Sequence, residues 1–318
     1  MTEGSHNINA SVLFYRHTFT VFTPTFNRAH TLYRVYRSLQ EQTYRDFEWL
    51  IIDDGSTDNT SDLIKIWQKE AEFPIRYLWQ ENQGINFAIN VGVKEAQGDF
   101  FLLIGSDDSF MPEALERFIF YWKSIPEDKR DQFVGVTGLC RDQNGNLIGD
   151  ELPLEVLDSN SMEIRYKYKI RGEMWGFLKT DIIKQFPFPV LPGTKFIPEG
   201  IIWNAIARKY KTRFINIPLR IYWINENNES DQLTKTSTPG IYAKGLALWH
   251  LSRLNNEISW FFNAPKEFFR SAVHFGRFSF HTNTSIWQQF KLLENNFARC
   301  LWLLMLPAAI LVFKKDPK

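Results

Sequence analysis

The stretch FFLLIGSDD, residues 100–108, joins an apolar run directly to a pair of carboxylates, Asp107 and Asp108. An apolar run of this length is typical of a buried strand, which then ends just before the carboxylates. Open α/β sheets bind their ligands at the carboxyl ends of their strands. Two carboxylates at such an end suit a hard cation that is held against phosphate oxygens. The alternative is that Asp108 or Ser109 only caps the helix that begins near Pro112.

The chain around this stretch alternates apolar runs with helical patterns. Its first part contains four candidate strands, which are Thr18–Thr23, Phe47–Ile52, Ile75–Trp79 and Phe100–Ile104. Between these strands, apolar residues recur at the spacing of one helix face. Such alternation predicts βαβ units, and therefore an α/β fold with a mainly parallel, Rossmann-like sheet flanked by helices.

Beyond the acidic pair the pattern becomes less regular. Phe133–Leu139 predicts another strand, followed by a turn at Asn144–Gly145. Glu199–Tyr210 predicts a helix, and Arg213–Ile224 predicts extended chain. Because Pro218 interrupts this last segment, we expect an edge strand or a break there.

These patterns divide the chain into four parts. Residues 1–17 lack the apolar core of a secretory signal, and we expect them to form a disordered lead-in. We expect residues 18–225 to form the α/β domain and the polar residues 226–240 to form a linker. Residues 241–318 should then form a helical region rich in aromatic and basic side chains.

Composition narrows the class of protein. The formal net charge of +1 argues against a nucleic-acid-binding surface over the whole molecule. The two cysteines, Cys140 and Cys300, lie far apart, so neither a disulfide framework nor a cysteine-rich zinc site is expected. A reducing compartment such as the cytoplasm fits this cysteine usage best. The sequence carries no signal of the oligomeric state.

Two further polar segments follow predicted strands. Residues 23–28, TPTFNR, offer hydroxyls, an amide, an aromatic ring and a cation that a nucleotide can use. Residues 53–58, DDGSTD, again place two carboxylates at the end of a strand. Turn formation and helix capping are the alternatives for these two segments. In a parallel sheet, however, Phe26, Asp54 and Asp107–Asp108 lie along one edge, which favours a single ligand site.

Together these segments resemble glycosyltransferase family 2, whose members are inverting nucleotide-sugar transferases with a GT-A fold. TPTFNR looks like the first loop of that family, and IIDDGSTDNT, residues 51–60, looks like its second. The resemblance continues through residues 82–84, 98–100 and 106–108 and covers about residues 18–225. It implies a nucleotide-sugar donor. It also implies a glycan acceptor, or a sugar carried on a polyprenyl diphosphate, as in relatives that assemble bacterial surface polysaccharides.

The resemblance implies a role for each matched residue. Phe26 and Asp54 would contact the nucleotide base, which favours a UDP donor. Asp107 would approach the ribose or a phosphate, and Asp108 would bind Mn²⁺ or Mg²⁺. The implied donor-binding set is Thr23, Pro24, Thr25, Phe26, Asn27, Asp53, Asp54 and Asp107.

Inversion at an anomeric carbon needs a base that takes the proton of the acceptor. Glu199, in FIPEGIIW at residues 196–203, resembles the acidic motif of the family and is the expected catalytic base. That motif commonly reads Glu-Asp, whereas this chain has Gly200 after the Glu. One alternative is that Glu199 is only a first-turn carboxylate favoured by the helix dipole, and Glu173 is the reserve base.

Two departures from the family pattern keep other functions open. Gly105 stands where many members have an Asp, and Ile85 stands where some have a cation, so diphosphate recognition would differ. Both departures suggest a non-catalytic nucleotide-sugar-binding scaffold of a membrane assembly complex. A nucleotidyltransferase is the weaker alternative, because residues 23–28 contain no Gly to cradle a triphosphate.

Residues 258–318 combine many aromatic side chains with an excess of Lys and Arg over Asp and Glu. This composition suits a helix that lies in an anionic membrane interface. The apolar run Cys300–Phe313 is shorter than the roughly 20 residues that span a bilayer, and Pro307 interrupts it. We therefore expect a surface-lying or re-entrant segment, and a peripheral location on the inner face of the cell membrane. The alternative is a helical cap on the α/β domain or a dimer interface.

Overall fold

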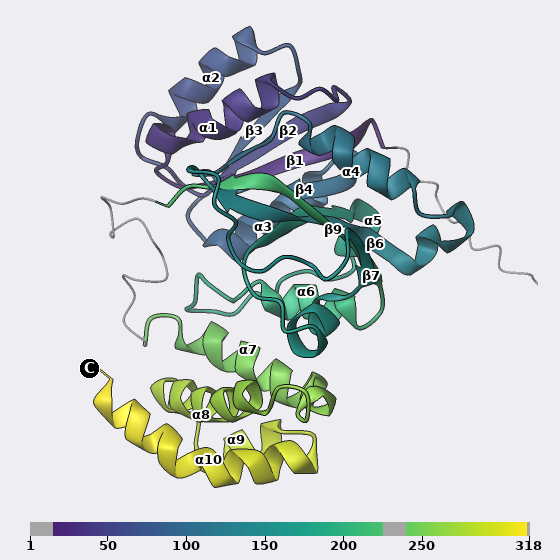
Figure 1. The fold of residues 1–318 in the computed structure, drawn as a ribbon. Helices are drawn as coiled ribbons and strands as arrows, with labels where there is room; N and C mark the ends of the chain where they lie inside the picture. Colours follow the sequence, from purple (N-terminus) through teal and green to yellow (C-terminus); the bar gives the residue numbers. More distant parts are fainter. Residues whose placement is uncertain (1–14, 225–239, 317–318) are drawn as a thin grey trace, which may run out of the picture.

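The structure is a computed structural model that describes residues 15–224 and 240–316. Within these residues a nine-stranded sheet has the order β3-β2-β1-β4-β8-β6-β9-β5, and β7 pairs with β9 (Figure 1). The first four strands are parallel and are linked by helices: β1 (His17–Thr25), α1 (Ala29–Gln40), β2 (Phe47–Asp53), α2 (Thr60–Glu70), β3 (Ile75–Trp79), α3 (Ile85–Glu95) and β4 (Gly98–Leu103). The predicted α/β fold is confirmed.

Burial on both faces explains the continuous apolar runs of the first strands. Successive residues of a strand point to opposite faces of the sheet. Phe19 and Trp49 pack with the apolar stripe of α1, whereas Phe22 and Leu50 pack with α3 on the other face. Every residue of β2 is buried. Strands covered on both sides read as unbroken hydrophobic runs, which is the pattern of residues 100–104 as well.

The remaining strands make the sheet mixed. β8 (Met174–Lys179) pairs antiparallel with β4 and with β6 (Phe133–Asp142), and β6 pairs parallel with β9 (Lys211–Tyr222). The short strands β5 (Ser109–Phe110) and β7 (Val156–Ser159) pair antiparallel with β9. The helices of this part are α4 (Ala114–Lys123), a 3-10 helix (Glu127–Gln132), a π-helix (Glu163–Lys167), α5 (Thr180–Ile183) and α6 (Gly200–Ala207).

Of the two expectations for Pro218, the edge strand is wrong, whereas an interruption of the strand pairing is present. β9 is one strand with partners on both sides, namely β6 on one side and β7 and β5 on the other. Pro218 falls between the residues that pair with β7 and those that pair with β5, and the register with β6 shifts beside it. Proline is tolerated there because the ladder needs no N–H donor at an interruption of this kind.

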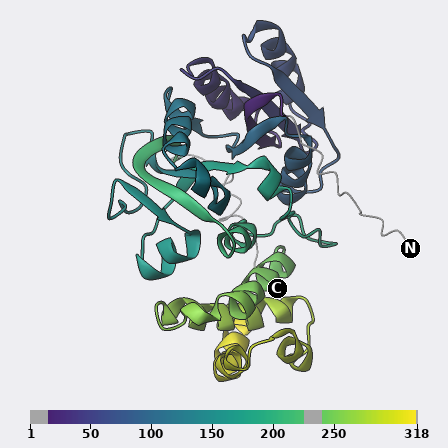
Figure 2. The same cartoon turned by 90° about the vertical axis from the view of Figure 1, so that its right-hand side faces the viewer.

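Residues 240–316 form a layer of helices, which Figures 1 and 2 show on one side of the α/β domain. The layer consists of α7 (Ala243–Asn256), a 3-10 turn (Ile258–Trp260), α8 (Pro265–His281), α9 (Ile286–Leu292) and α10 (Asn296–Lys315). Leu254, Phe268, Phe275 and Trp302 are buried in its core. Tyr166 of the π-helix belongs to the same cluster, so the layer shares its core with the α/β domain.

A buried polar network also attaches this layer next to α6. Glu257 accepts hydrogen bonds from the Tyr166 hydroxyl at 2.6 Å and from Asn204 Nδ2 at 2.9 Å. Arg253 donates to the Tyr166 hydroxyl from Nη2 at 2.9 Å. Arg253 and Glu257 are both buried, so the charges compensate each other where water is excluded.

Two expectations fall largely outside the described residues, namely the lead-in at 1–17 and the linker at 226–240. The C-terminal helix is longer than the apolar run of residues 300–313 indicated, and the expectation of a surface-lying or re-entrant segment stays a prediction. α10 has 20 residues and continues through Pro307. By length and composition it could cross a bilayer, because polar residues at both ends extend the apolar run into a longer helix.

Candidate active site

The segment after β1 is partly buried and partly exposed. β1 continues to Thr25, two residues beyond the predicted end. Thr23 is fully buried, and its hydroxyl accepts a hydrogen bond from Trp49 Nε1 at 3.0 Å. Phe26, in contrast, is 47% exposed. Thr23 thus supports the segment from beneath, while the Phe26 ring is accessible to a planar ligand.

Asn27 joins the two segments that the sequence assigns to the donor. Its φ of 53° lies in the left-handed region, which Asn tolerates better than most residues. In this conformation its N–H donates to Ser56 Oγ and its Oδ1 accepts from the Thr57 N–H, both at 2.8 Å. The Asp54 N–H donates to the Thr25 carbonyl at 2.8 Å. The two segments therefore lie side by side at the carboxyl ends of β1 and β2.

Asp53 shapes the second segment from inside. It is fully buried, and it accepts hydrogen bonds from the Ser56 N–H and from the Tyr77 hydroxyl, both at 2.7 Å. Burial and the neighbouring Asp53 raise the pKa of Tyr77, which keeps the phenol a neutral donor. Asp53 thus fixes the turn that positions Asp54, and direct donor contact by Asp53 stays a prediction.

Asp54 holds the loop that follows β3. Its Oδ1 accepts hydrogen bonds from Gln80 Nε2 at 2.8 Å and from the Gln83 N–H at 2.9 Å. Its Oδ2 accepts from the Gly84 N–H at 2.7 Å. Because a carboxylate oxygen can accept two hydrogen bonds, Oδ2 retains one acceptor position for a ligand.

Asp107 and Asp108 each place a carboxylate oxygen near Gly105. A Cβ on residue 105 would lie 3.0 Å from Asp107 Oδ1 and 3.0 Å from Asp108 Oδ2. Real Cβ atoms rarely approach other atoms so closely, so a side chain at this position would push against both carboxylates. Glycine at position 105 therefore allows both carboxylate oxygens to lie close to the same point of the backbone.

Arg220, which the sequence analysis does not single out, forms an ion pair with Asp108. Its Nε donates to Asp108 Oδ2 at 3.0 Å, and its Nη2 donates to the same oxygen. Asp108 Oδ1 accepts from the Trp223 N–H at 3.3 Å. Burial raises the pKa of Asp108 to about 6, although the Arg220 charge opposes this effect. An Arg in a strand more than a hundred residues downstream offers no sequence signal for this contact.

Arg34 and Trp223 fix the backbone of the acidic segment. Arg34 Nη1 donates to the Asp107 carbonyl at 2.8 Å, and its guanidinium lies 4.3 Å from the centre of the Trp223 ring. Trp223 Nε1 in turn donates to Ser109 Oγ at 2.8 Å. The acidic segment is therefore held by residues of α1 and of the end of β9. The sequence pattern gives no sign that either element contacts this segment.

Glu199 stands immediately before α6, and Trp203 Nε1 donates to its Oε2 at 3.3 Å. Within the described residues its side chain makes no capping hydrogen bond to α6. Burial is the main effect on the pKa of Glu199 and raises it. The hydrogen bond from Trp203 and the charge of Arg220 lower this pKa in part, whereas the charge of the exposed Glu173 raises it. The structure therefore brings the predicted base into the field of the same guanidinium that pairs with Asp108.

The acidic pair fits a divalent cation. Mg²⁺ and Mn²⁺ prefer oxygen ligands, and proteins often bind Mg²⁺ with one or two carboxylates plus substrate phosphates. Asp107 Oδ1 and Asp108 Oδ2 lie near the same point beside Gly105. In residues 15–224 and 240–316, no group of three or more His, Cys, Asp and Glu side chains is arranged to hold a metal. The donor set thus suits a cation that takes its other ligands from a bound diphosphate.

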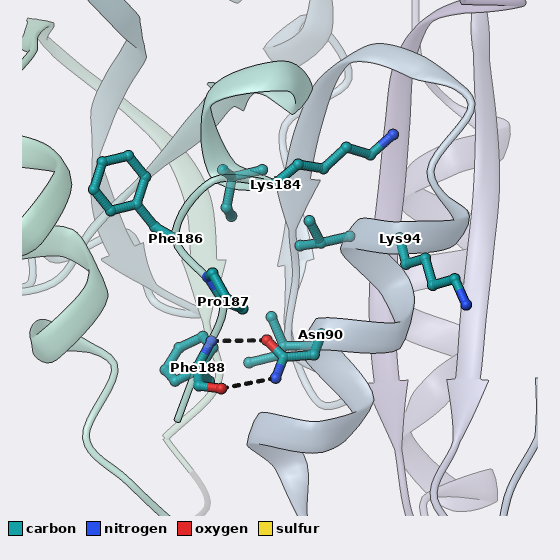
Figure 3. Close-up of a pocket in the computed structure, with 9 residues that line it drawn as sticks. Asn90, Lys94, Lys184, Phe186, Pro187 and Phe188 are labelled. Atoms are coloured by element: carbon teal, nitrogen blue, oxygen red, sulfur yellow. Dashed lines mark hydrogen bonds between the residues drawn. The ribbon is translucent and has the colours of Figure 1, made fainter. Parts of the chain in front are cut away.

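The pocket in Figure 3 lies away from these residues. It is formed by α3 and the segment after α5, where Asn90 exchanges hydrogen bonds of 2.9 and 2.8 Å with the backbone of Phe188. Lys94 and Lys184 stand at its rim. Its lining contains none of the candidate active-site residues. The candidate site is instead the polar edge of the sheet.

The family model described as glycosyl transferase family 2 matches residues 20–179 of this sequence. The chain belongs to glycosyltransferase family 2. The matched residues include the segments at 23–28, 53–58 and 105–108, and they end before Glu199. Family membership therefore rests on the half of the site that the sequence assigns to the donor.

Individual relatives are more distant. A Campylobacter jejuni protein named GalNAc(5)-diNAcBac-PP-undecaprenol beta-1,3-glucosyltransferase is 26% identical over 247 residues, which cover 75% of this chain and 74% of that protein. Three uncharacterized glycosyltransferases, from Rickettsia felis, Nostoc sp. and Rickettsia conorii, are matched over less than a third of their own length.

Solved structures of glycosyltransferases share the fold. S. aureus TarS 1–349 in complex with UDP-GlcNAc has a TM-score of 0.55 and 19% identity, covering 92% of this chain and 80% of that one. The mannosyltransferase PcManGT from Pyrobaculum calidifontis, in complex with GDP-Man and Mn²⁺, has a TM-score of 0.50 and 15% identity, covering 96% and 89%. At these identities the likeness establishes the GT-A fold alone.

Proposed function

We propose that this protein is an inverting, divalent-cation-dependent glycosyltransferase that moves a sugar from a UDP donor to a glycan or a lipid-linked acceptor in surface-polysaccharide synthesis. The observation that carries the proposal is the placement of Asp107 and Asp108 at the carboxyl end of β4, beside the segments that follow β1 and β2. A single displacement requires a cation at the leaving diphosphate and a general base at the acceptor, and we assign these roles to Asp108 and Glu199. Family membership and the resemblance to TarS with UDP-GlcNAc support the donor class.

The donor would bind along the edge formed by β1, β2 and β4. We assign the Phe26 ring to stacking on the base and the open acceptor position of Asp54 Oδ2 to a base N–H. Asp107 is assigned to the ribose or a phosphate. The Thr25 hydroxyl is buried and has no hydrogen-bond partner among the described residues, so a donor hydroxyl would satisfy it.

In the transfer step, the acceptor hydroxyl oxygen forms a bond to the anomeric carbon while the bond from that carbon to the diphosphate oxygen breaks. Glu199 takes the hydroxyl proton onto a carboxylate oxygen, and UDP leaves with the electron pair of the broken bond. A raised pKa strengthens Glu199 as a base near neutral pH. Glu173, which is exposed nearby, is the reserve base.

The departing diphosphate needs positive charge. A bound Mn²⁺ or Mg²⁺ would supply it as a Lewis acid, and Asp108 would hold the ion beside the phosphates. Arg220 adds a fixed guanidinium at the same place. Preorganised charge of this kind stabilises the leaving group without reorganisation during the reaction.

We further propose that the acceptor is a glycan or a sugar on a polyprenyl diphosphate, and that the protein acts at the cytoplasmic face of the cell membrane. The name of the C. jejuni relative includes an undecaprenol-linked saccharide, which supports a lipid-linked acceptor. The apolar helix α10 supports proximity to a membrane.

A donor screen tests the proposal. Purified protein is incubated with a panel of nucleotide sugars, with Mn²⁺ or with EDTA, and with or without a bacterial lipid extract, and the released nucleotide is quantified. We expect Mn²⁺-dependent release of UDP from one UDP-sugar and stimulation by the lipid extract. Release of GDP would overturn the donor assignment, and release of pyrophosphate would indicate nucleotidyl transfer. Calorimetric binding of a UDP-sugar without any release would favour the alternative of a non-catalytic scaffold.

A further inference from the structure

α10 turns an apolar stripe away from the rest of the protein. Phe297, Leu304, Pro307 and Leu311 recur at the spacing of one helix face, and Leu304 and Leu311 are 70% and 62% exposed. The opposite side of α10 is buried and consists of Ala298, Leu301, Trp302 and Ala309. Surface helices normally present polar residues to water. An outer face that is also apolar therefore indicates contact with a second apolar medium.

Exposed aromatic side chains extend this face beyond α10. Phe262 is 87% exposed, and its ring stacks on that of Phe297 with centroids 6.5 Å apart. Trp287 of α9 is 63% exposed, and the Lys291 ammonium lies 5.2 Å from its ring. Aromatic rings beside Lys side chains are characteristic of protein surfaces at the headgroup level of a membrane.

The charges on α10 are all positive. The helix contains Arg299, Lys314 and Lys315 but no Asp or Glu, and both lysines are exposed directly after the apolar stripe. The next residue, Asp316, faces inward, where it accepts hydrogen bonds from Arg277 Nε at 2.7 Å and pairs with His281. Asp316, the acidic residue next to the two lysines, is therefore paired with α8 and does not form an ion pair with Lys314 or Lys315.

We propose that the outer face of α10, together with Phe262, is a docking surface for an anionic lipid bilayer, with the helix lying in the plane of the interface. Apolar side chains enter the acyl boundary while Lys314 and Lys315 contact anionic headgroups. A second copy of the chain is disfavoured as the partner. In a symmetric dimer the same face of α10 meets itself, so the cations of one copy would face a helix that contains no Asp or Glu.

A membrane-spanning orientation is also disfavoured by the packing. α10 lies so close to α8 that a Cβ on Gly276 would be 2.8 Å from Ala309 Cβ. Spanning would require the helix to leave α8 and expose Trp302, which is fully buried. Figures 1 and 2 show α10 on the side of the helical layer that faces away from the sheet. Leu304 and Leu311 are already exposed there, so contact with a bilayer surface does not require α8 to move.

Vesicle co-sedimentation of the full chain tests the proposal. We compare phosphatidylcholine vesicles with vesicles that also contain phosphatidylglycerol. Leu304→Glu combined with Leu311→Glu removes the apolar contact, and Lys314→Glu combined with Lys315→Glu removes the charge contact. Phe120→Glu, at a 60% exposed residue of α4, is the matched control. We expect wild type and control to sediment with anionic vesicles, and both double variants to lose at least tenfold in the bound-to-free ratio.

Unchanged sedimentation of the Leu304 and Leu311 variant would overturn the proposal, and so would equal binding to both vesicle types. A wild-type dimer that this variant dissociates, without vesicle binding, would identify a second copy as the occupant. Thermal melting by circular dichroism confirms that the variants fold. The choice of a membrane as partner rests on the proposed function. UDP release from a soluble donor is measured separately, so loss of vesicle binding can be told apart from failure of the transferase assignment.

Discussion

Arg220 directs two N–H donors at one oxygen of Asp108, and that oxygen lies near the point beside Gly105 that Asp107 Oδ1 also approaches. The guanidinium therefore neutralises the carboxylate that we assign to a cation. A metal ion that arrives without nucleotide meets a pair with little net charge. We expect cation affinity to stay low until the diphosphate of the donor contributes its own charge.

Arg220→Gln should make cation binding independent of the nucleotide. Removing the guanidinium frees Asp108 Oδ2, so Mn²⁺ should bind the nucleotide-free protein about tenfold tighter or more, since two unit charges near 4 Å interact by about 4 kcal/mol at a protein-like dielectric. Electron paramagnetic resonance of free Mn²⁺ measures this affinity. Arg213→Gln is the matched control, because Arg213 lies on β9 like Arg220 but forms its ion pair with Asp158 of β7. Weaker Mn²⁺ binding by Arg220→Gln would mean that Arg220 instead holds Asp108 in its ligating position.

Asp108→Ala should abolish cation-dependent transfer. The substitution removes a carboxylate ligand and leaves Arg220 without its partner, and we expect UDP release to fall on the order of 100-fold or more. Titration with Mn²⁺ checks whether added cation restores the rate, and we expect no restoration. A variant with an unchanged Mn²⁺ dependence would exclude Asp108 as a ligand.

Glu199→Gln should stop chemistry while leaving donor binding largely intact. Gln keeps the shape of the side chain but cannot take a proton, so kcat should fall by about 10²–10⁴-fold. Calorimetry with UDP should give an affinity close to that of wild type. Glu173→Gln is the paired variant. Full activity in Glu199→Gln combined with loss in Glu173→Gln would transfer the role of base to Glu173.

The rate should depend on pH through Glu199. A general base acts only when it is deprotonated, and burial raises the pKa of Glu199 above the ordinary Glu value of about 4.3. The value of kcat/KM should therefore decline, as pH falls, at a higher pH than an exposed Glu would give. A profile measured at saturating Mn²⁺ checks this, and the residual activity of Glu199→Gln should lack that acidic limb. An acidic limb that persists in the Gln variant would belong to another group.

Gly105→Ala tests whether the close approach of both carboxylates to residue 105 matters for catalysis. A methyl group at this position would lie 3.0 Å from Asp107 Oδ1 and Asp108 Oδ2, so both carboxylates must shift by a few tenths of an ångström. We expect kcat/KM to fall by about tenfold, since small misplacements of positioning groups are costly in catalysis. Tm should change little, because Gly105 is partly exposed. Unchanged kinetics would place the cation elsewhere.

The sequence predicted the first half of the fold well. β1 to β4 are short runs rich in apolar residues and separated by helical patterns, and the burial of β1, β2 and β4 on both faces makes that pattern strong. The second half was harder, because β9 passes through Pro218 by using a gap between two short partner strands. Such a gap depends on β5 and β7, which are too short to leave a periodic signal.

By itself, the sequence determined which residues end the strands: Phe26, Asp54, Asp107 and Asp108 follow apolar runs whose parallel pairing is encoded locally. Only the tertiary structure decided what those residues face. Arg220 reaches Asp108 because the pairing of β9 with β6 and β5 sets which of its side chains points to the site, and periodicity carries no register between distant strands. In the same way, the composition of α10 indicated an apolar helix, but its packing on α8 decided which of its two apolar sides is left to the outside.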